Sequence, residues 1–368
     1  MDILAILAHM RDMQASDCYL KVGNKPAMRI HGDLVWQEMP AVTDENMQSV
    51  IQVLLTDHQQ RIFAERPDLD FAFHLESGDR FRINLFRQQG HAGLVARLIR
   101  SEDLSFATLR LPHSVQELAS LNRGLVLITG ATGSGKSTTL ASLIHAVNQR
   151  YPKHIMTIED PIEFIHEDNK SIINQREVGY DTLSFADALR HVVRQSPDVI
   201  LIGELRDTDS ILTAVSAAQT GHLVFSTLHT VDVFHTLDRL INYFPDYLKS
   251  QIRQELALSL EAVVCMRLLR RADAQGRVPA LEIMRTTPSI KKALAEGEFW
   301  KMKEFMQSGE DAGMQTFNQA LLRLYQQEVI TFEEALQASS NPEEFKLNAQ
   351  GMFTGTQSIK FFQSDQPS

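Results

Sequence analysis

The stretch Gly124-Leu-Val-Leu-Ile-Thr129, followed directly by Gly130-Ala-Thr-Gly-Ser-Gly-Lys-Ser-Thr138, decides the fold. Its first six residues form an apolar run long enough for a buried strand. Beyond Ser137 the apolar residues recur at helical spacing, at Leu140, Leu143, Ile144 and Val147. A glycine-rich turn between a buried strand and a helix is the arrangement of a phosphate-binding P-loop, and all eight positions of that pattern match.

This turn predicts that the protein binds a nucleoside triphosphate, ATP, together with Mg²⁺. The glycines let backbone N–H groups turn toward phosphate oxygens, and the helix N-terminus adds its dipole. Lys136 would reach the β- and γ-phosphates, and the Ser137 hydroxyl would hold the metal. The predicted nucleotide-binding residues are Gly130, Ala131, Thr132, Gly133, Ser134, Gly135, Lys136, Ser137 and Thr138.

Length and composition describe an ordinary globular protein with more than one domain. The chain has 368 residues, 43% of them hydrophobic and 22% charged, and a net charge of −10. That charge argues against a general nucleic-acid binder. Cys18 and Cys265 fit no metal spacing and indicate buried, reduced thiols. No basic signal region opens the chain, and no apolar run approaches the ~20 residues of a membrane span, so we expect a cytoplasmic protein.

The first hundred residues predict an α+β domain. Asp2 can cap a first helix, and two more helices are expected between Thr43 and Ala64. Residues that alternate with period two indicate strands. The expected strands lie within Ser16–Val22, Asn24–Ile30, Asp70–Phe73, Arg80–Phe86 and Gly93–Ile99, with a turn at His31–Asp33.

From Leu125 the pattern changes to buried apolar strands that alternate with helices, which predicts a mostly parallel α/β sheet. The polar segment 272–277 interrupts this pattern, and the residues beyond it indicate helices. The expected strands are Leu125–Thr129, Ile155–Ile158, Val199–Ile202 and Leu223–Ser226, and the expected later helices are Ile290–Glu296, Phe299–Gln307, Thr316–Gln327 and Thr331–Gln337. The predicted boundaries are 1–100, a linker at 101–115, a core at 116–271, a helical region at 272–345 and a loose tail at 346–368.

Two carboxylates follow predicted strands, where ligands bind in open α/β sheets. Glu163 ends the acidic turn Glu159-Asp-Pro-Ile-Glu163 and is our candidate for the base that deprotonates the attacking water. Glu204 ends the strand of Val199–Ile202 and is similar to a Walker B acid that faces the Mg²⁺ shell, through a water. An acidic turn taken alone is more often a solvated loop.

Histidines and arginines form two further candidate groups. His222 and His229 bracket one strand and could sense the γ-phosphate, although a lone histidine is more often structural. The N-terminal domain carries Arg80, Arg82, Arg87, Arg97 and Arg100 on two strands. A solvated sheet face would explain them, and so would arginine fingers that reach a neighbouring subunit's site in a ring.

Together these motifs resemble the secretion and pilus ATPases, specifically the type IV pilus retraction branch, PilT and PilU. The matching stretches are Ala15–Leu20, Arg80–Asn84, the P-loop, Glu159–Glu163, Gly203–Asp207, Thr220–His222 and Thr227–His229. The resemblance implies a PAS-like N-terminal domain joined to a RecA-like ATPase core, and a hexameric ring. It also implies Glu163 as catalytic base, Glu204 as Walker B acid, His222 and His229 as the histidine box, and Arg82 and Arg97 as arginines that act in trans.

The implied activity is ATP hydrolysis coupled to pilus retraction and twitching motility, at the cytoplasmic side of the inner membrane and with an inner-membrane platform protein as partner. Departures from the pattern are Ala131 in place of proline and Gln219 in place of glutamate. The segment from Gly313 to Leu336 is more similar to PilU. Alternatives are an accessory ring subunit that assists a paralogous motor, and a pilus assembly or secretion ATPase. A nucleic-acid motor is disfavoured by the negative charge.

Overall fold

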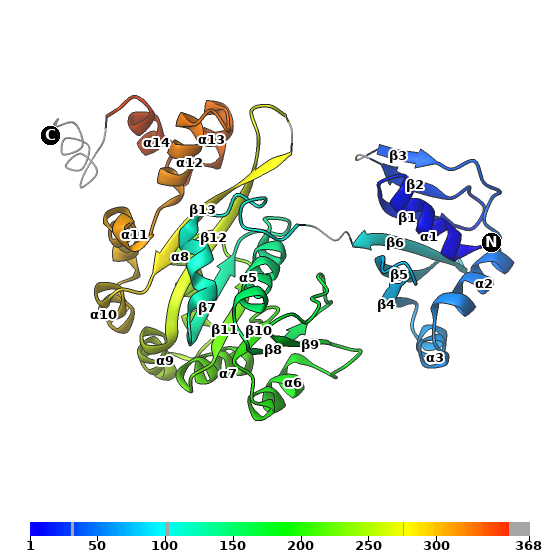
Figure 1. Cartoon of the computed structure of the whole chain (residues 1–368), viewed down its shortest axis with the longest axis horizontal. Coiled ribbons are helices and arrows are strands. Elements are labelled where there is room, and N and C mark those ends of the chain that lie inside the picture. The colour runs from blue at the N-terminus through cyan, green and yellow to red at the C-terminus, as the bar shows by residue number, and fades with distance from the viewer. Residues whose placement is uncertain (31–32, 100–102, 275, 353–368) are drawn as a thin grey trace. The chain divides into compact units, whose positions relative to one another are not determined.

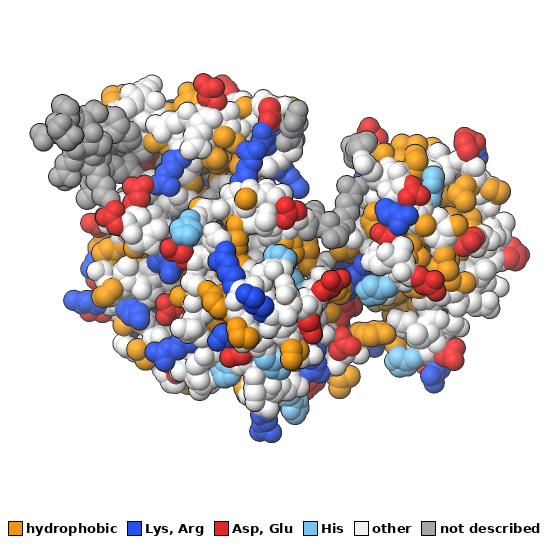
Figure 2. All heavy atoms as spheres, in the orientation of Figure 1, with side chains coloured by type: hydrophobic (Ala, Val, Ile, Leu, Met, Phe, Trp, Pro, Cys, Tyr) orange, Lys and Arg blue, Asp and Glu red, His pale blue; other side chains and the backbone are white. Residues whose placement is uncertain are grey.

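The computed structural model describes residues 1–30, 33–99, 103–274 and 276–352 (Figure 1). The chain divides into two compact units, Met1–Glu102 and Asp103–Ser368. On the face drawn in Figure 2, acidic and basic side chains are interspersed over each unit. No helix in the described ranges combines the length and the apolar character needed to span a membrane.

The first unit is an antiparallel sheet packed against helices. Its strands are β1 (Ala15–Lys21), β2 (Ala27–Ile30), β3 (Asp33–Trp36), β4 (Asp68–His74), β5 (Arg80–Gln88) and β6 (His91–Ile99), and its helices are α1 (Ile3–Asp12), α2 (Asp44–Leu54) and α3 (Asp57–Glu65). The described strands run in the order β3-β2-β1-β6-β5-β4. Every neighbouring pair is antiparallel.

Local sequence explains these elements. The Asp2 side chain accepts a hydrogen bond from the Ala5 N–H at 3.1 Å and so caps α1, as predicted. Thr43 and Thr56 form capping boxes at α2 and α3. Alternate residues of β5, such as Phe81 and Ile83, are fully buried and form the core. β3 was not singled out as a separate strand, and most of the predicted turn at 31–33 lies outside the described residues.

The second unit is built on a sheet that is parallel except at one edge. Its strands are β7 (Gly124–Thr129), β8 (His154–Glu159), β9 (Ile172–Glu177), β10 (Val199–Ile202), β11 (Leu223–Leu228), β12 (Leu260–Arg270) and β13 (Arg277–Arg285). They run in the order β13-β12-β7-β11-β10-β8-β9, and only β13 pairs in antiparallel fashion. The helices are α4 (His113–Gln116), α5 (Lys136–Arg150), α6 (Phe185–Val192), α7 (Thr208–Gln219), α8 (Val233–Asn242), α9 (Asp246–Ser259), α10 (Pro288–Glu296), α11 (Met302–Ser308), α12 (Phe317–Gln326), α13 (Phe332–Ala338) and α14 (Pro342–Ala349).

Strand β7 lies inside this sheet, between β12 and β11, and all six of its residues are buried. Leu125 and Leu127 face one hydrophobic cluster, whereas Val126 and Ile128 face another. An uninterrupted apolar run is therefore what a strand covered on both faces requires. Because β7 is hydrogen-bonded to a strand on each side, the loop that follows it starts from a fixed position.

Two predicted boundaries differ from the structure. Phe106, Leu111 and Val115, assigned to a linker, are buried in the core of the second unit. β13 was placed in a helical region, yet it pairs with β12 along its length and belongs to the sheet. The signal for this strand was a short run that is apolar from Val278 to Met284 except at Glu282, without strict alternation.

The C-terminal helices agree with the expected ranges, with one addition. α10, α11, α12 and α13 fall on the four predicted segments, the second of which begins as a short 3₁₀ turn at Phe299–Lys301. α14 runs across the predicted boundary between the helical region and the loose tail at 345/346, and its Phe345 and Asn348 are buried. Residues 353–368 of that tail lie outside the described part of the chain.

Candidate active site

The loop that follows β7 has a backbone that only glycine can supply at its first position. Gly130 has a φ of +148°. A Cβ at this position would lie 2.4 Å from Ser134 Oγ and 2.6 Å from the Met266 carbonyl oxygen. Gly135, at a φ of +96°, precedes the first turn of α5. The loop therefore turns tightly and presents the N-terminus of α5 to the space above the sheet.

Lys136 is the first residue of α5 and is only 8% exposed. Its Nζ donates hydrogen bonds to the carbonyl oxygens of Gly130 at 2.9 Å and Ala131 at 3.0 Å. Burial lowers the pKa of Lys136, and the carboxylates of Glu204 and Glu163 oppose that shift. The ammonium group is thus held inside its own loop, next to two acidic side chains.

A pocket of about 410 Å³ opens beside this lysine. Nine of the predicted site residues line it: Thr132, Gly133, Gly135, Lys136, Ser137, Thr138, Glu163, Glu204 and His229. Ala131 and Ser134 instead line a neighbouring hollow of about 260 Å³ on the β12 side of the loop. The walls come from the carboxyl ends of β7, β8, β10 and β11, which meet at one edge because these strands are parallel.

Glu204 stands at the centre of a charged group in this pocket. Its Oε2 accepts a hydrogen bond from Arg206 Nε at 2.8 Å and lies 3.6 Å from His229 Nε2. A guanidinium nitrogen of Arg206 also lies 3.6 Å from Asp160 Oδ2. The hydrogen bond to Glu204 raises the pKa of Arg206, so its positive charge is retained. Arg206 therefore joins the acidic turn after β8 to the acid after β10.

Two other carboxylates of the acidic turn have different environments. Glu159 Oε1 accepts hydrogen bonds from Thr157 Oγ1 at 2.6 Å and Gln175 Nε2 at 3.2 Å, so that side chain is tied to the sheet. Glu163 is exposed in the pocket wall, and no hydrogen bond or ion pair reaches its side chain from the described residues. Of the two, Glu163 is the one available to accept a proton from a water molecule.

The two histidines bracket β11, as expected, and therefore lie at opposite ends of that strand. His229 follows β11 at the pocket edge of the sheet, and Arg239 donates a hydrogen bond to its carbonyl oxygen at 3.2 Å. His222 precedes β11, and its Nδ1 lies 3.0 Å from the Ala217 carbonyl. The strand between them has six residues, so the two histidines are seven steps apart along the chain, about 23 Å at roughly 3.3 Å per residue.

The candidate arginines all lie in the first unit. Arg82 on β5 faces Arg97 on β6 in the sheet register. Arg97 Nε donates to Asp17 Oδ1 at 2.8 Å, and Arg82 lies 4.0 Å from Asp70. Arg80 is only 6% exposed, so it is the least accessible of the three.

Sequence reasoning missed two basic residues that line the pocket. Arg206 follows Glu204 by two residues in the stretch Gly203–Asp207, and the signal for it was a positive charge inside an acidic motif. Arg277 opens β13 and lines both the pocket and the neighbouring hollow. Nothing local pointed to Arg277, because only the pairing of β13 with β12 brings it to the loop.

Known proteins resemble this chain along nearly its whole length. A profile of the family described as Type II/IV secretion system protein matches residues 2–356. The type IV pilus retraction ATPase PilT of Pseudomonas aeruginosa is 41% identical over 345 residues, which cover 94% of this chain and 100% of the relative. The type IV pilus ATPase PilU of the same organism is 37% identical over 347 residues, which cover 94% and 91%. A crystal structure described as the pilus retraction motor PilT with bound ADP superposes with a TM-score of 0.88 at 41% identity, covering 94% of this chain and 98% of the other.

Proposed function

The chain belongs to the Type II/IV secretion system protein family, and from this premise we propose that it is an ATPase that powers type IV pilus retraction. It is an ATP hydrolase of mixed α/β fold, related to a retraction motor whose crystal structure holds ADP. Within that fold we assign the first unit as PAS-like and the second as a RecA-like ATPase core.

One observation supports ATP hydrolysis at this site above all others. A buried lysine, two candidate acids and a histidine line one pocket at the edge where the parallel strands end. Lys136 supplies positive charge at the loop, while Glu163, Glu204 and His229 stand across from it. Positioned charges around a transferring phosphoryl group are the main requirement of this reaction.

The residues present fit a magnesium ion. The Ser137 hydroxyl and the Glu204 carboxylate both line the pocket, and hard oxygen donors are the ligands that Mg²⁺ prefers. Ser137 and Glu204 would hold the ion, Glu204 through a water molecule. When bound, the ion neutralises charge on the phosphate oxygens.

The side chains then divide the work of hydrolysis. Lys136 exchanges its two loop carbonyls for phosphate oxygens and stabilises their charge. Glu163 accepts the proton of the attacking water at its exposed carboxylate. His229 is held beside Glu204 and faces the γ-phosphate side of the pocket. His222 lies at the opposite end of β11, so we assign it no step at the pocket of its own chain.

The protein is a homo-oligomer in this proposal, and we place it in a hexameric ring. Arg82 and Arg97 face each other on one side of a sheet and would reach a neighbouring protomer's nucleotide as arginine fingers. Arg97 would first have to release Asp17, whose side chain is buried. Closure around ATP would then be coupled to movement of the N-terminal unit.

We place this ring in the cytoplasm, at the inner membrane, where it would act on the platform protein of the pilus machine. A second candidate function is an accessory ring subunit that assists a paralogous retraction motor. The similarity to PilU over 94% of the chain supports this alternative. Retention of Glu163 and Glu204 in the pocket favours the motor that hydrolyses ATP itself.

Steady-state ATPase measurements on the purified protein test the proposal. We expect Lys136→Ala to abolish turnover, and Glu163→Gln to lower kcat by roughly 100-fold or more with little change in KM. Glu167→Gln, a nearby exposed acid outside the pocket lining, is the matched control and should behave as the parent. Turnover by Lys136→Ala at the parent rate would exclude hydrolysis at this site.

A further inference from the structure

Glu282, in the middle of β13, caps two helices at once. It is 7% exposed. Its Oε1 accepts a hydrogen bond from the Val233 N–H at 2.9 Å, and its Oε2 accepts one from the Phe317 N–H at 3.4 Å. These are the first residues of α8 and α12. Helix N-termini carry unpaired N–H groups and partial positive charge, so one carboxylate stabilises both ends and fixes their spacing.

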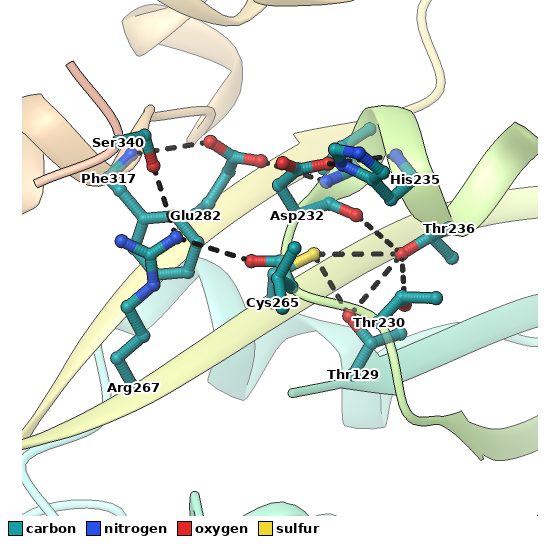
Figure 3. Close-up of polar contacts among 12 residues, drawn as sticks. Thr129, Thr230, Asp232, His235, Thr236, Cys265, Arg267, Glu282, Phe317 and Ser340 are labelled. Carbon is teal, nitrogen blue, oxygen red and sulfur yellow. Dashed lines mark hydrogen bonds and ion pairs between the residues drawn. The ribbon is translucent and has the colours of Figure 1, made fainter. Parts of the chain in front are cut away.

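Arg267, on the neighbouring strand β12, also joins the start of α8 to the C-terminal helices. We call Glu282 and Arg267 together the bridge. Arg267 Nη2 lies 3.5 Å from the Val231 carbonyl oxygen, in the loop before α8. The same nitrogen donates to Ser340 Oγ at 3.1 Å, in the segment before α14, and Nη1 donates to the Ala338 carbonyl. The guanidinium lies 3.9 Å from the centre of the Phe317 ring. Figure 3 shows Glu282 and the Arg267 guanidinium beside Phe317, with Ser340 on one side and Asp232 on the other.

The segment held on one side of this bridge is the loop His229–Asp232. Its Thr230 hydroxyl is 2.6 Å from the hydroxyl of Thr236 on α8. Thr236 in turn lies 3.4 Å from Thr129, the last residue of β7 before the P-loop (Figure 3). The loop is only four residues long and is fixed at both ends by β11 and α8. Arg239 of α8 also donates to the His229 carbonyl at 3.2 Å, so a shift of α8 would act directly on the residue beside Glu204.

We propose that Glu282 and Arg267 are positioning residues that set His229 against Glu204, and that the helices α12–α14 act on the ATP site through them. This inference rests on the proposed function, hydrolysis at the Lys136 pocket. It assigns the C-terminal helices a role in the rate of hydrolysis, although none of them lines the pocket. A load or a partner on those helices would change kcat rather than nucleotide affinity.

Glu282→Gln is the variant that tests the bridge. The amide oxygen can accept only one of the two N–H groups, and the NH₂ group then opposes the other donor. We expect kcat to fall about tenfold while KM for ATP changes by less than about twofold. In a His229→Ala background the same substitution should have almost no further effect, because a positioning residue acts only through its target. Hydrogen exchange of the His229–Val233 amides should be faster in Glu282→Gln.

Gln315→Ala is the matched control. Gln315 is 8% exposed, donates to the Leu281 carbonyl at 2.9 Å, and lies just before α12, but it does not contact the His229 loop. It should lower stability and leave kcat unchanged. An equal loss of kcat in Gln315→Ala, or independent effects of Glu282→Gln and His229→Ala, would overturn the inference. Absence of wild-type turnover would refute the proposed function, whereas active wild-type protein with unchanged kcat and loop exchange in Glu282→Gln would refute the bridge alone.

Discussion

At the scale of single residues, Arg206 and Lys136 in the pocket both have acidic side chains nearby. Arg206 lies between Glu204 and Asp160, and Lys136 faces Glu204 and Glu163. A triphosphate brings several negative charges into this space. Lys136 can accommodate them because its present partners are neutral carbonyls, which it can exchange without leaving a carboxylate unpaired.

Substitution of His229 and of His222 should have different effects on the rate of ATP hydrolysis. His229→Ala is expected to lower kcat by roughly 10- to 100-fold, because it removes a group that faces Glu204 in the pocket. His222→Ala should change kcat by less than about twofold, since it lies at the other end of β11. Steady-state kinetics with saturating ATP measures both. A large loss in His222→Ala would mean that this edge of the sheet contributes to the pocket of a neighbouring copy.

His166, another residue of the pocket wall, should make the free energy of unfolding decrease as the pH falls. Burial lowers the pKa of His166 from its ordinary value of 6.5 to about 4. Between these values the unfolded chain binds a proton that the folded chain does not, so stability falls as the pH falls. Urea unfolding should show a loss of about 1–2 kcal/mol from this group between about pH 7 and about pH 5, reduced by its partial exposure. His166→Gln should remove that part of the pH dependence, and an unchanged slope would contradict the assignment.

Among the helices and strands, the antiparallel strand β13 places the residues that link the pocket to the C-terminal helices. It brings Arg277 to the lip of the pocket and Glu282 to the two helix N-termini. It also supplies Val278 and Ala280 to the cluster beneath the C-terminal helices. One edge strand therefore connects the ATPase core to α12–α14.

α14 is a packed element in the structure, and its removal from the cluster should be costly. Phe345 is fully buried, and its ring lies 5.7 Å from that of Phe332 and 6.4 Å from that of Tyr325. We expect Phe345→Ala to lower the free energy of unfolding by about 3–5 kcal/mol. Leu347→Ala, on the same helix but 39% exposed, should cost less than about 1.5 kcal/mol. Denaturant unfolding compares them, and equal costs would mean that α14 does not pack as described.

For the whole molecule, similarity confirms the family that the motifs predicted. A family profile spans residues 2–356, and PilT relatives match over 94% of the chain. The role of the arginines in catalysis remains a prediction. Arg82 and Arg97 lie in the first unit, whereas the pocket lies in the second.

Mixing two inactive variants tests whether the arginines act between protomers. Arg97→Ala and Lys136→Ala should each be inactive alone. In a ring assembled from an equal mixture, about a quarter of the sites would pair an intact Lys136 with an intact Arg97 from the next protomer. ATPase activity should therefore partly recover on mixing. No recovery, with both variants folded and assembled, would exclude action of Arg97 in trans.

Local sequence was enough for every feature that depends on neighbours along the chain. The apolar run of β7, the glycines after it and Lys136 at the start of α5 specify the loop, because backbone conformation and helix start are set within a few residues. The acids that follow β8 and β10 could be predicted in the same way, because parallel strands end at a common edge.

Only the tertiary structure decided which distant side chains meet. It paired Arg206 with Asp160 and placed β13 in the sheet beside β12. It also placed Glu282 between two helix N-termini that are 84 residues apart, from Val233 to Phe317. Strand order and register determine these contacts, and both are settled by burial of apolar surface across the whole unit, which no local pattern of residues specifies.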